Sequence, residues 1–181
     1  MNKKAIILHG RYGKPEHHWF PYVERELKNI GLEVINIELP LCDKNRALIR
    51  LKFIETIGTN RNTILIGHSS GGVMAMRYAE NHQLLGSVLV AACQSHFEDE
   101  ELIKSGYFNS PWDWSKIKNN QRWIVQYAST DDPHIPISDA RIIRDALNTD
   151  YYEYNNQGHF GYSARKFEFP EIVEEITKRL E

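Results

Sequence analysis

The chain has 181 residues, 41% of them hydrophobic and 11% aromatic, and its 22 basic and 24 acidic residues leave a formal net charge of −2. This length and composition fit one packed domain over residues 1–181, because a single hydrophobic core can grow to this size. A nearly neutral charge balance supplies no field for a nucleic acid. We therefore expect no nucleic-acid partner.

The basic N-terminal residues are followed by an apolar run of only four residues, 5–8. This run is shorter than a signal peptide requires, and no other segment is apolar enough to span a bilayer. The two cysteines, Cys42 and Cys93, are too few and too far apart for a disulfide framework or a metal cluster. The sequence therefore predicts a cytoplasmic protein with no membrane segment.

Six short apolar runs recur along the chain, and each has the length of a buried strand. They cover residues 5–8, 33–39, 63–66, 85–92, 123–128 and 151–155. Segments with apolar residues at helical spacing alternate with them, at residues 20–30, 48–57, 73–81, 142–147 and 172–180. Regular alternation of strand and helix favours parallel strands joined by right-handed crossovers. The predicted fold class is therefore α/β, a three-layer sandwich with a mostly parallel six-stranded sheet.

Residues 94–120 interrupt this alternation between the fourth and fifth predicted strands, and they are too many for a plain connection. Long excursions at strand ends commonly shape substrate pockets. We therefore predict that Phe108, Trp112 and Trp114 contact substrate. The alternative is that the two tryptophans anchor the loop against the core, since aromatic side chains are packing residues first.

The sequence Gly67-His68-Ser69-Ser70-Gly71 matches the G-x-S-x-G turn that exposes a nucleophilic serine. A predicted strand precedes it and a predicted helix follows it, which is the context that the motif requires. Glycines are needed because the sharp turn strains the serine backbone and leaves no space for side chains on either side. Ser69 is therefore the candidate nucleophile.

A serine hydroxyl needs an imidazole as base and a third group that orients the imidazole. In hydrolases with this turn the chain order is serine, acid, histidine. His159 follows the sixth predicted strand and is the best candidate for the base. The other histidines weighed for this role, His82, His96 and His134, have weaker positions in the predicted elements.

Two adjacent aspartates follow the fifth predicted strand, in the sequence Asp131-Asp132-Pro133. We choose Asp132 as the acid because an aliphatic residue and a proline, Ile135-Pro136, come shortly after it. Asp131 is interpreted as a turn or capping residue. The alternative for both is a plain Asp-Asp-Pro turn, which the position after a core strand disfavours.

The reaction also needs two backbone N–H groups that stabilise the oxyanion. Ser70, at a helix N-terminus, is one candidate donor. The other comes from the loop after the first strand, where Arg11 is the first choice and Tyr12 the second. The Arg11 guanidinium has two alternative roles, binding of a substrate carboxylate or plain solvation.

Tyr12 and Trp19 are also predicted to contact substrate at the rim of the same cleft, together with the adjacent His17 and His18. A pair of histidines can indicate a metal site. No carboxylate or cysteine completes a ligand set at suitable spacing here. We therefore expect neither a metal nor another cofactor.

Several blocks of the sequence, spread over nearly its whole length, resemble the family of small serine hydrolases typified by retinoblastoma-binding protein 9 and the bacterial YdeN-like proteins. The blocks are residues 66–71, 76–80, 105–108, 111–118, 129–133 and 158–160. The resemblance implies a reduced α/β-hydrolase fold and a catalytic triad on Ser69, Asp132 and His159. It does not carry over a retinoblastoma-type partner, because the chain has no Leu-x-Cys-x-Glu motif. Residues 10–15 depart from the family's glycine-rich turn, so the resemblance leaves the second oxyanion donor open.

The leading hypothesis is a metal-independent, carboxylesterase-like serine hydrolase that cleaves small ester, thioester or activated amide substrates through an acyl-enzyme. The small-molecule acyl substrate is the one partner that the motifs indicate, and the oligomeric state is left open. The competing hypothesis is a binding or regulatory protein that keeps the scaffold without catalysis.

Overall fold

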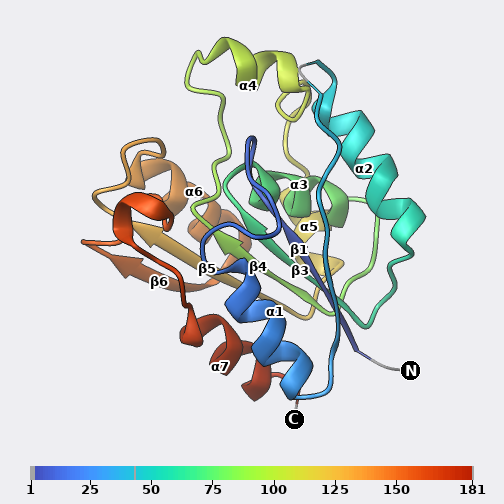
Figure 1. Ribbon diagram of the computed structural model, residues 1–181. Helices are drawn as coiled ribbons and strands as arrows, with labels where there is room; N and C mark the ends of the chain where they lie inside the picture. The colour runs from blue at the N-terminus through green and yellow to red at the C-terminus, as the bar shows by residue number, and fades with distance from the viewer. Residues whose placement is uncertain (1–2, 43, 181) are drawn as a thin grey trace.

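Figure 1 shows the computed structural model of the chain, which describes residues 3–42 and 44–180. Six strands form one sheet in the order β2-β1-β3-β4-β5-β6, and every neighbouring pair is parallel. The predicted six-stranded sheet is therefore confirmed. The strands are β1 (Lys4–Leu8), β2 (Glu33–Asn36), β3 (Thr63–His68), β4 (Gly86–Val90), β5 (Trp123–Ser129) and β6 (Asp150–Tyr154).

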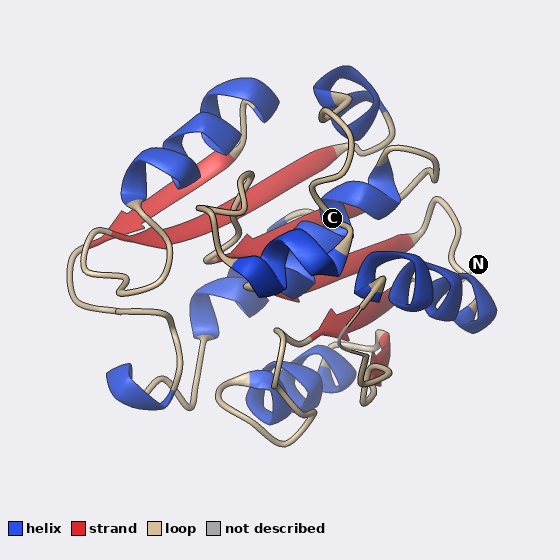
Figure 2. Cartoon of the chain, turned by 90° about the horizontal axis from the view of Figure 1, so that it is seen from above, coloured by secondary structure: helices blue, strands red, loops and turns tan. Residues whose placement is uncertain are grey.

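Helices cover both faces of the sheet and make the predicted three layers (Figures 1 and 2). They are α1 (Phe20–Asn29), α2 (Arg46–Ile57), α3 (Ser70–Ala79), α4 (Glu100–Ser105), α5 (Trp114–Asn119), α6 (Ile137–Leu147) and α7 (Pro170–Lys178), with a 3-10 turn at Tyr162–Ala164. Helices α1 and α7 pack on one face, and α2, α3, α5 and α6 on the other. None of the described helices combines the length and the apolar character needed to cross a membrane.

The two core layers follow from the alternation of side chains along the central strands. In β1, Ile6 and Leu8 join the cluster under α3, and Ala5 and Ile7 join the cluster under α1 and α7. All four side chains are fully buried. In a strand that is buried on both faces every side chain lies in a core, which explains the uninterrupted apolar sequence of β1.

Several element boundaries differ from the sequence prediction, those of β2 and α3 among them. Strand β2 ends at Asn36 instead of residue 39. The side-chain amide of Asn36 donates to the Pro15 carbonyl and to the Glu24 carboxylate. Helix α3 begins at Ser70, not at residue 73, so that Gly71 and Gly72 lie inside its first turn. Glycine is a poor helix former, and the pattern of larger apolar residues therefore missed this turn.

Helix α2 is the largest departure in packing. The sequence spacing predicts an apolar face of Leu48, Leu51, Ile54 and Ile57, whereas Leu48 is 56% exposed in the structure. The buried residues of the helix are Arg46, Ala47, Arg50 and Ile54. Two arginines therefore share the inward face with Ile54, while Leu51 and Ile57 pack against the core partly buried.

The parallel order places the carboxyl ends of all six strands along one edge of the sheet, and the loops that leave this edge build the candidate site. The opposite, amino edge holds both ends of the described chain (Figure 1). There the Lys3 ammonium donates to the Leu180 carbonyl.

Candidate active site

Ser69 lies at the turn between β3 and α3, in a backbone conformation that residues other than glycine rarely adopt. Its φ is 54° and its ψ is −124°. The Ser69 amide donates to the Val90 carbonyl at 2.8 Å, which fastens the turn to the end of β4. Such strain persists only where the surroundings impose it, and it is common at functional sites.

The glycines of the motif are required by close packing around this turn. A Cβ at Gly67 would lie 2.4 Å from the Gly71 carbonyl oxygen, and a Cβ at Gly71 would lie 2.0 Å from the carbonyl oxygen of Leu8. Both distances are far below van der Waals contact, and both partners are backbone atoms that cannot move aside. The spacing of the motif therefore follows from the packing of α3 against β1 and β3.

Asp132 and His159 come from the loops after β5 and β6 and form a direct contact. Asp132 Oδ2 lies 2.8 Å from His159 Nδ1, and the two side chains are 3% and 18% exposed. The second carboxylate oxygen, Oδ1, accepts hydrogen bonds from the His134 and Ile135 amides at 2.8 and 3.1 Å. These bonds leave the Asp132 carboxylate little freedom to rotate.

The neighbouring Asp131 has a different role. Its Oδ1 accepts hydrogen bonds from the Ser129 hydroxyl and, at 3.0 Å, from the Gly158 amide. Asp131 thereby ties the loop after β5 to the loop that carries His159, as expected for a capping residue.

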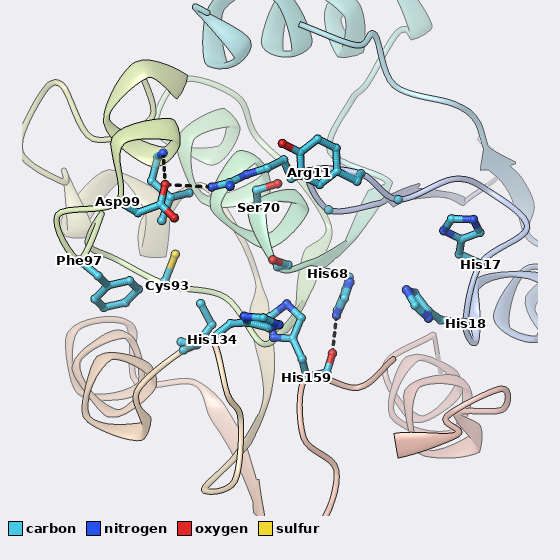
Figure 3. A pocket seen from close by; sticks show the side chains of 16 residues that line it. Arg11, His17, His18, His68, Ser70, Cys93, Phe97, Asp99, His134 and His159 are labelled. Atoms are coloured by element: carbon cyan, nitrogen blue, oxygen red, sulfur yellow. Dashed lines mark hydrogen bonds and ion pairs between the residues drawn. The ribbon is translucent and has the colours of Figure 1, made fainter. Parts of the chain in front are cut away.

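A pocket of about 680 Å³ opens at this edge of the sheet, and both Ser69 and His159 line it. Figure 3 shows Cys93 and Phe97 on one side, His17 and His18 on the other. The remaining lining residues are Gly10, Arg11, Tyr12, Gly13, His68, Ser70, Asp99, Leu102, His134 and Ile135. The structure thus places Ser69 and His159 in the lining of one pocket, with Asp132 in contact with His159.

Several imidazoles surround His159, and burial keeps the innermost ones neutral. The fully buried His68 donates from Nε2 to the His159 carbonyl at 2.8 Å, as the dashed line in Figure 3 marks. Burial lowers the pKa of His68 well below its ordinary value and lowers the pKa of His18 to about 4. Among the residues that the structure describes, no group of three or more His, Cys, Asp or Glu side chains is arranged to hold a metal ion.

The loop after β1 lies against the serine. A Cβ at Gly10 would be 3.6 Å from Ser69 Oγ, and the Gly10 carbonyl accepts a hydrogen bond from His9 Nδ1 at 2.8 Å. His9 Nε2 in turn accepts from the Leu39 amide at 2.8 Å, which fixes the tautomer. Within the described chain, the Arg11 amide donates to no backbone or side-chain acceptor.

The Arg11 side chain is engaged with α4. Its guanidinium contacts Glu101 at 2.6 Å and Asp99 at 3.4 Å, and the Tyr12 hydroxyl donates to Glu101 at 2.9 Å. The guanidinium is therefore paired with the Asp99 and Glu101 carboxylates and is not plainly solvated. These contacts join the loop after β1 to the segment that supplies Phe97 and Leu102 to the pocket.

The predicted substrate-contacting aromatics separate into two groups. Tyr12 lines the pocket, whereas Trp19 is fully buried in the core and donates from its indole nitrogen to the Phe160 carbonyl at 3.1 Å. The side chains of Phe108, Trp112 and Trp114 pack against the core and are absent from the lining of this pocket.

The alternative interpretation, a loop anchor, describes Trp112. Its indole nitrogen donates to the Gln94 carbonyl at 2.8 Å, and the Arg77 guanidinium lies 3.6 Å from the centre of its ring. Phe97 and Leu102 form the apolar wall that the sequence prediction assigned to Phe108 and the tryptophans.

A parallel sheet with a strained serine at the strand-to-helix turn and a histidine–aspartate pair at the same edge defines an α/β hydrolase. The serine hydrolase family model matches residues 5–178, so the chain belongs to the serine hydrolase family. It is a serine hydrolase, and the resemblance noted from the sequence is confirmed.

The similar proteins agree with this assignment. The chain is 38% identical to the serine hydrolase RBBP9 of Rattus norvegicus, over 98% of this chain and 95% of the relative. The solved structure of the ydeN gene product from B. subtilis has a TM-score of 0.90 at 23% identity and covers 99% of both chains. Est1E from Butyrivibrio proteoclasticus has a TM-score of 0.79 at 11% identity, over 99% of this chain and 88% of that one, and it shares the fold.

Proposed function

We propose that the protein hydrolyses small esters through an acyl-enzyme on Ser69, with His159 as general base and Asp132 as the orienting acid. The observation that carries the proposal is the 2.8 Å contact between His159 Nδ1 and Asp132 Oδ2 beside a pocket that Ser69 lines. A proton on Nδ1 that is donated to Asp132 leaves Nε2 unprotonated, and Nε2 is the nitrogen that can accept the serine proton.

In the proposed reaction the Ser69 oxygen attacks the ester carbonyl carbon while its proton passes to His159 Nε2. The tetrahedral intermediate expels the alcohol, which takes the proton from His159. Water then attacks the acyl-enzyme with His159 again as base, and the carboxylic acid leaves with Ser69 restored. Asp132 stabilises the imidazolium that forms in both halves of the cycle.

We assign the stabilisation of the oxyanion to the backbone amides of Ser70 and Arg11. Ser70 begins α3, so its N–H lies at the positive end of a helix dipole. The Arg11 amide belongs to the loop that contacts Ser69, and no acceptor among the described residues occupies it. An N–H group without an internal partner is available to a developing negative charge.

The pocket suits a small acyl substrate. Its apolar wall consists of Phe97, Leu102, Ile135 and Cys93, and its volume of about 680 Å³ lies in the range of small-molecule sites. Thioesters and activated amides place a carbonyl carbon at the same position and are included in the proposal.

Covalent labelling by a fluorophosphonate tests the proposed function directly, because the probe reacts with an activated serine.

The expected result is that wild-type protein is labelled at Ser69 and hydrolyses p-nitrophenyl acetate, and that Ser69→Ala loses both activities. Ser87→Ala is the matched control, because Ser87 is a buried serine of β4 outside the pocket lining. Folded wild-type protein that is neither labelled nor active would contradict catalysis and favour the competing function, a binding protein that retains the hydrolase scaffold.

We also propose that the protein works in a reducing, cytoplasmic compartment. The described cysteines Cys42 and Cys93 are both free thiols. Oxidising compartments favour disulfide pairs. Fluorescence imaging of the tagged chain in its own cells would check this location.

A further inference from the structure

Arg50 is a buried arginine of α2 whose guanidinium faces the loop after β1. Its side chain is fully buried, and it donates to the carbonyls of Pro40 at 3.2 Å, Gly10 at 3.4 Å and Arg11 at 3.4 Å. In the described part of the chain, no carboxylate forms an ion pair with Arg50. Three carbonyl dipoles and the buried Tyr107 hydroxyl are therefore the partners of this charge.

Such an arrangement is costly, because a buried cation loses its hydration and here gains no opposite charge. Burial accordingly lowers the pKa of Arg50. An apolar side chain of similar size could fill the same position without this cost. What an arginine adds is a rigid planar fork of N–H donors that can hold several carbonyls in fixed directions.

The carbonyl directions determine where the neighbouring amides point. The Gly10 carbonyl and the Arg11 N–H belong to one planar trans peptide and point in opposite directions. A Gly10 carbonyl that is held toward α2 therefore turns the Arg11 N–H away from α2. In the same way, a fixed Arg11 carbonyl sets the direction of the Tyr12 N–H.

We propose that Arg50 is a positioning residue that holds the peptides on either side of Arg11 so that the Arg11 N–H is presented to the oxyanion. The inference rests on the proposed function of Ser69 as nucleophile. The His9 imidazole and the Gly13 backbone amide also donate to the Gly10 carbonyl, but among the described residues only Arg50 donates to the Arg11 carbonyl. Arg50 is therefore the side chain that restrains both peptides.

The test uses Arg50→Met, which keeps the side-chain length and removes every donor, and Arg50→Lys, which keeps the charge and loses the fork. We expect kcat for p-nitrophenyl acetate to fall roughly 10- to 100-fold in Arg50→Met, less than the 100- to 1000-fold typical of a deleted oxyanion donor, with KM changed less than threefold. Arg50→Lys should lie between wild type and Arg50→Met.

A trifluoromethyl ketone reports the oxyanion site separately, because its adduct with the serine carries a negative oxygen in that position. Its inhibition constant should rise by the same factor by which kcat/KM falls. The matched control is Ile54→Ala, one turn further along α2, whose fully buried side chain belongs to the core. This variant should lower the Tm and leave kcat and the inhibition constant unchanged below the Tm.

The inference is overturned if a folded Arg50→Met or Arg50→Lys variant keeps the wild-type kcat and inhibition constant. If Arg50→Met does not fold, Arg50→Lys decides the outcome by the same criteria. Failure of the proposed function looks different, because wild-type protein would then resist fluorophosphonate labelling. A loss of kcat in Ile54→Ala that equals the loss in Arg50→Met would also overturn the inference, since it would show a general effect of weakened packing.

Discussion

The His68 imidazole donates from Nε2 to the carbonyl oxygen of His159, at 2.8 Å, and so connects the residue before the candidate nucleophile to the backbone of the candidate base. The two rings are also in contact, with centroids 4.9 Å apart. His68 is the first of the two variable positions of the G-x-S-x-G turn. In this chain the position holds the loop after β6 against the turn after β3.

Replacing His68 therefore should misplace His159 without removing it. We expect His68→Phe to lower kcat about tenfold, which corresponds to the roughly 1.4 kcal/mol of one hydrogen bond. His68→Gln can still donate to the His159 carbonyl and should recover part of the loss. Steady-state kinetics on a p-nitrophenyl ester measures both effects, and equal activity in the Phe and Gln variants would contradict the role of the hydrogen bond.

Asp132→Asn should lower kcat by about 10³- to 10⁴-fold, because an amide in this position favours the wrong tautomer of His159. Asp131→Asn is the matched control, since an asparagine oxygen can still accept from Ser129 and Gly158. The control should retain most of the wild-type rate. A similar loss in both variants would mean that the loop, not the carboxylate charge, matters.

Gly71→Ala should prevent the native packing of α3, because the added Cβ would lie 2.0 Å from the Leu8 carbonyl oxygen. Gly31→Ala provides the comparison, since a Cβ there meets no atom within 4 Å and only the positive φ of 91° opposes it. We expect a cost of about 1 kcal/mol at Gly31 and a much larger loss at Gly71. Urea unfolding of the two variants measures the difference, and similar midpoints would refute the packing argument.

The stability of the protein should fall as the pH falls from about 6.5 toward 4. Burial lowers the pKa values of His9, His18 and His68 in the folded protein, that of His18 to about 4, whereas the unfolded chain binds protons near the ordinary value of 6.5. Between these values the unfolded state holds more protons, so acid favours unfolding.

Thermal unfolding followed from pH 7.5 to 4.5 would show this as a decreasing Tm. His18→Asn cannot titrate and should show a shallower decrease than the wild type. A Tm that stays constant over this range, or rises, would contradict the argument.

Phe97→Ala should weaken selection of the acyl group, because Phe97 lines the pocket on the side opposite His17 and His18 (Figure 3). We expect KM to rise more for butyrate esters than for acetate esters. The difference between the two changes should correspond to roughly 1 to 3 kcal/mol, which is what one hydrophobic contact contributes to specificity. Trp112→Phe, outside the pocket lining, should leave the ratio of the KM values for butyrate and acetate esters unchanged. A shift of the ratio in Trp112→Phe alone would restore the sequence prediction for that residue.

The features that could be predicted from the sequence are those that backbone packing dictates. Only glycine fits at positions 67 and 71, so the motif marks the turn even without coordinates. The positions of Asp132 and His159 follow from topology, because loops after parallel strands leave from the same edge of the sheet.

The features that were missed depend on three-dimensional contacts that leave no periodic pattern. Arg50 is fully buried against carbonyls, although arginine is among the residues most often exposed. Trp19 and Trp112 are as apolar as Phe97, and apolar character cannot distinguish a ring that faces the core from one that faces a cavity. His68 lay within the predicted motif, but the motif does not specify its partner.

The contact between Lys3 and Leu180 at the amino edge of the sheet also has a practical consequence. A short peptide linker joining these two positions would close the chain into a ring far from the chemistry. Circularly permuted versions, reopened at an exposed turn on that same side, should therefore keep their turnover while changing the order in which the strands are synthesised.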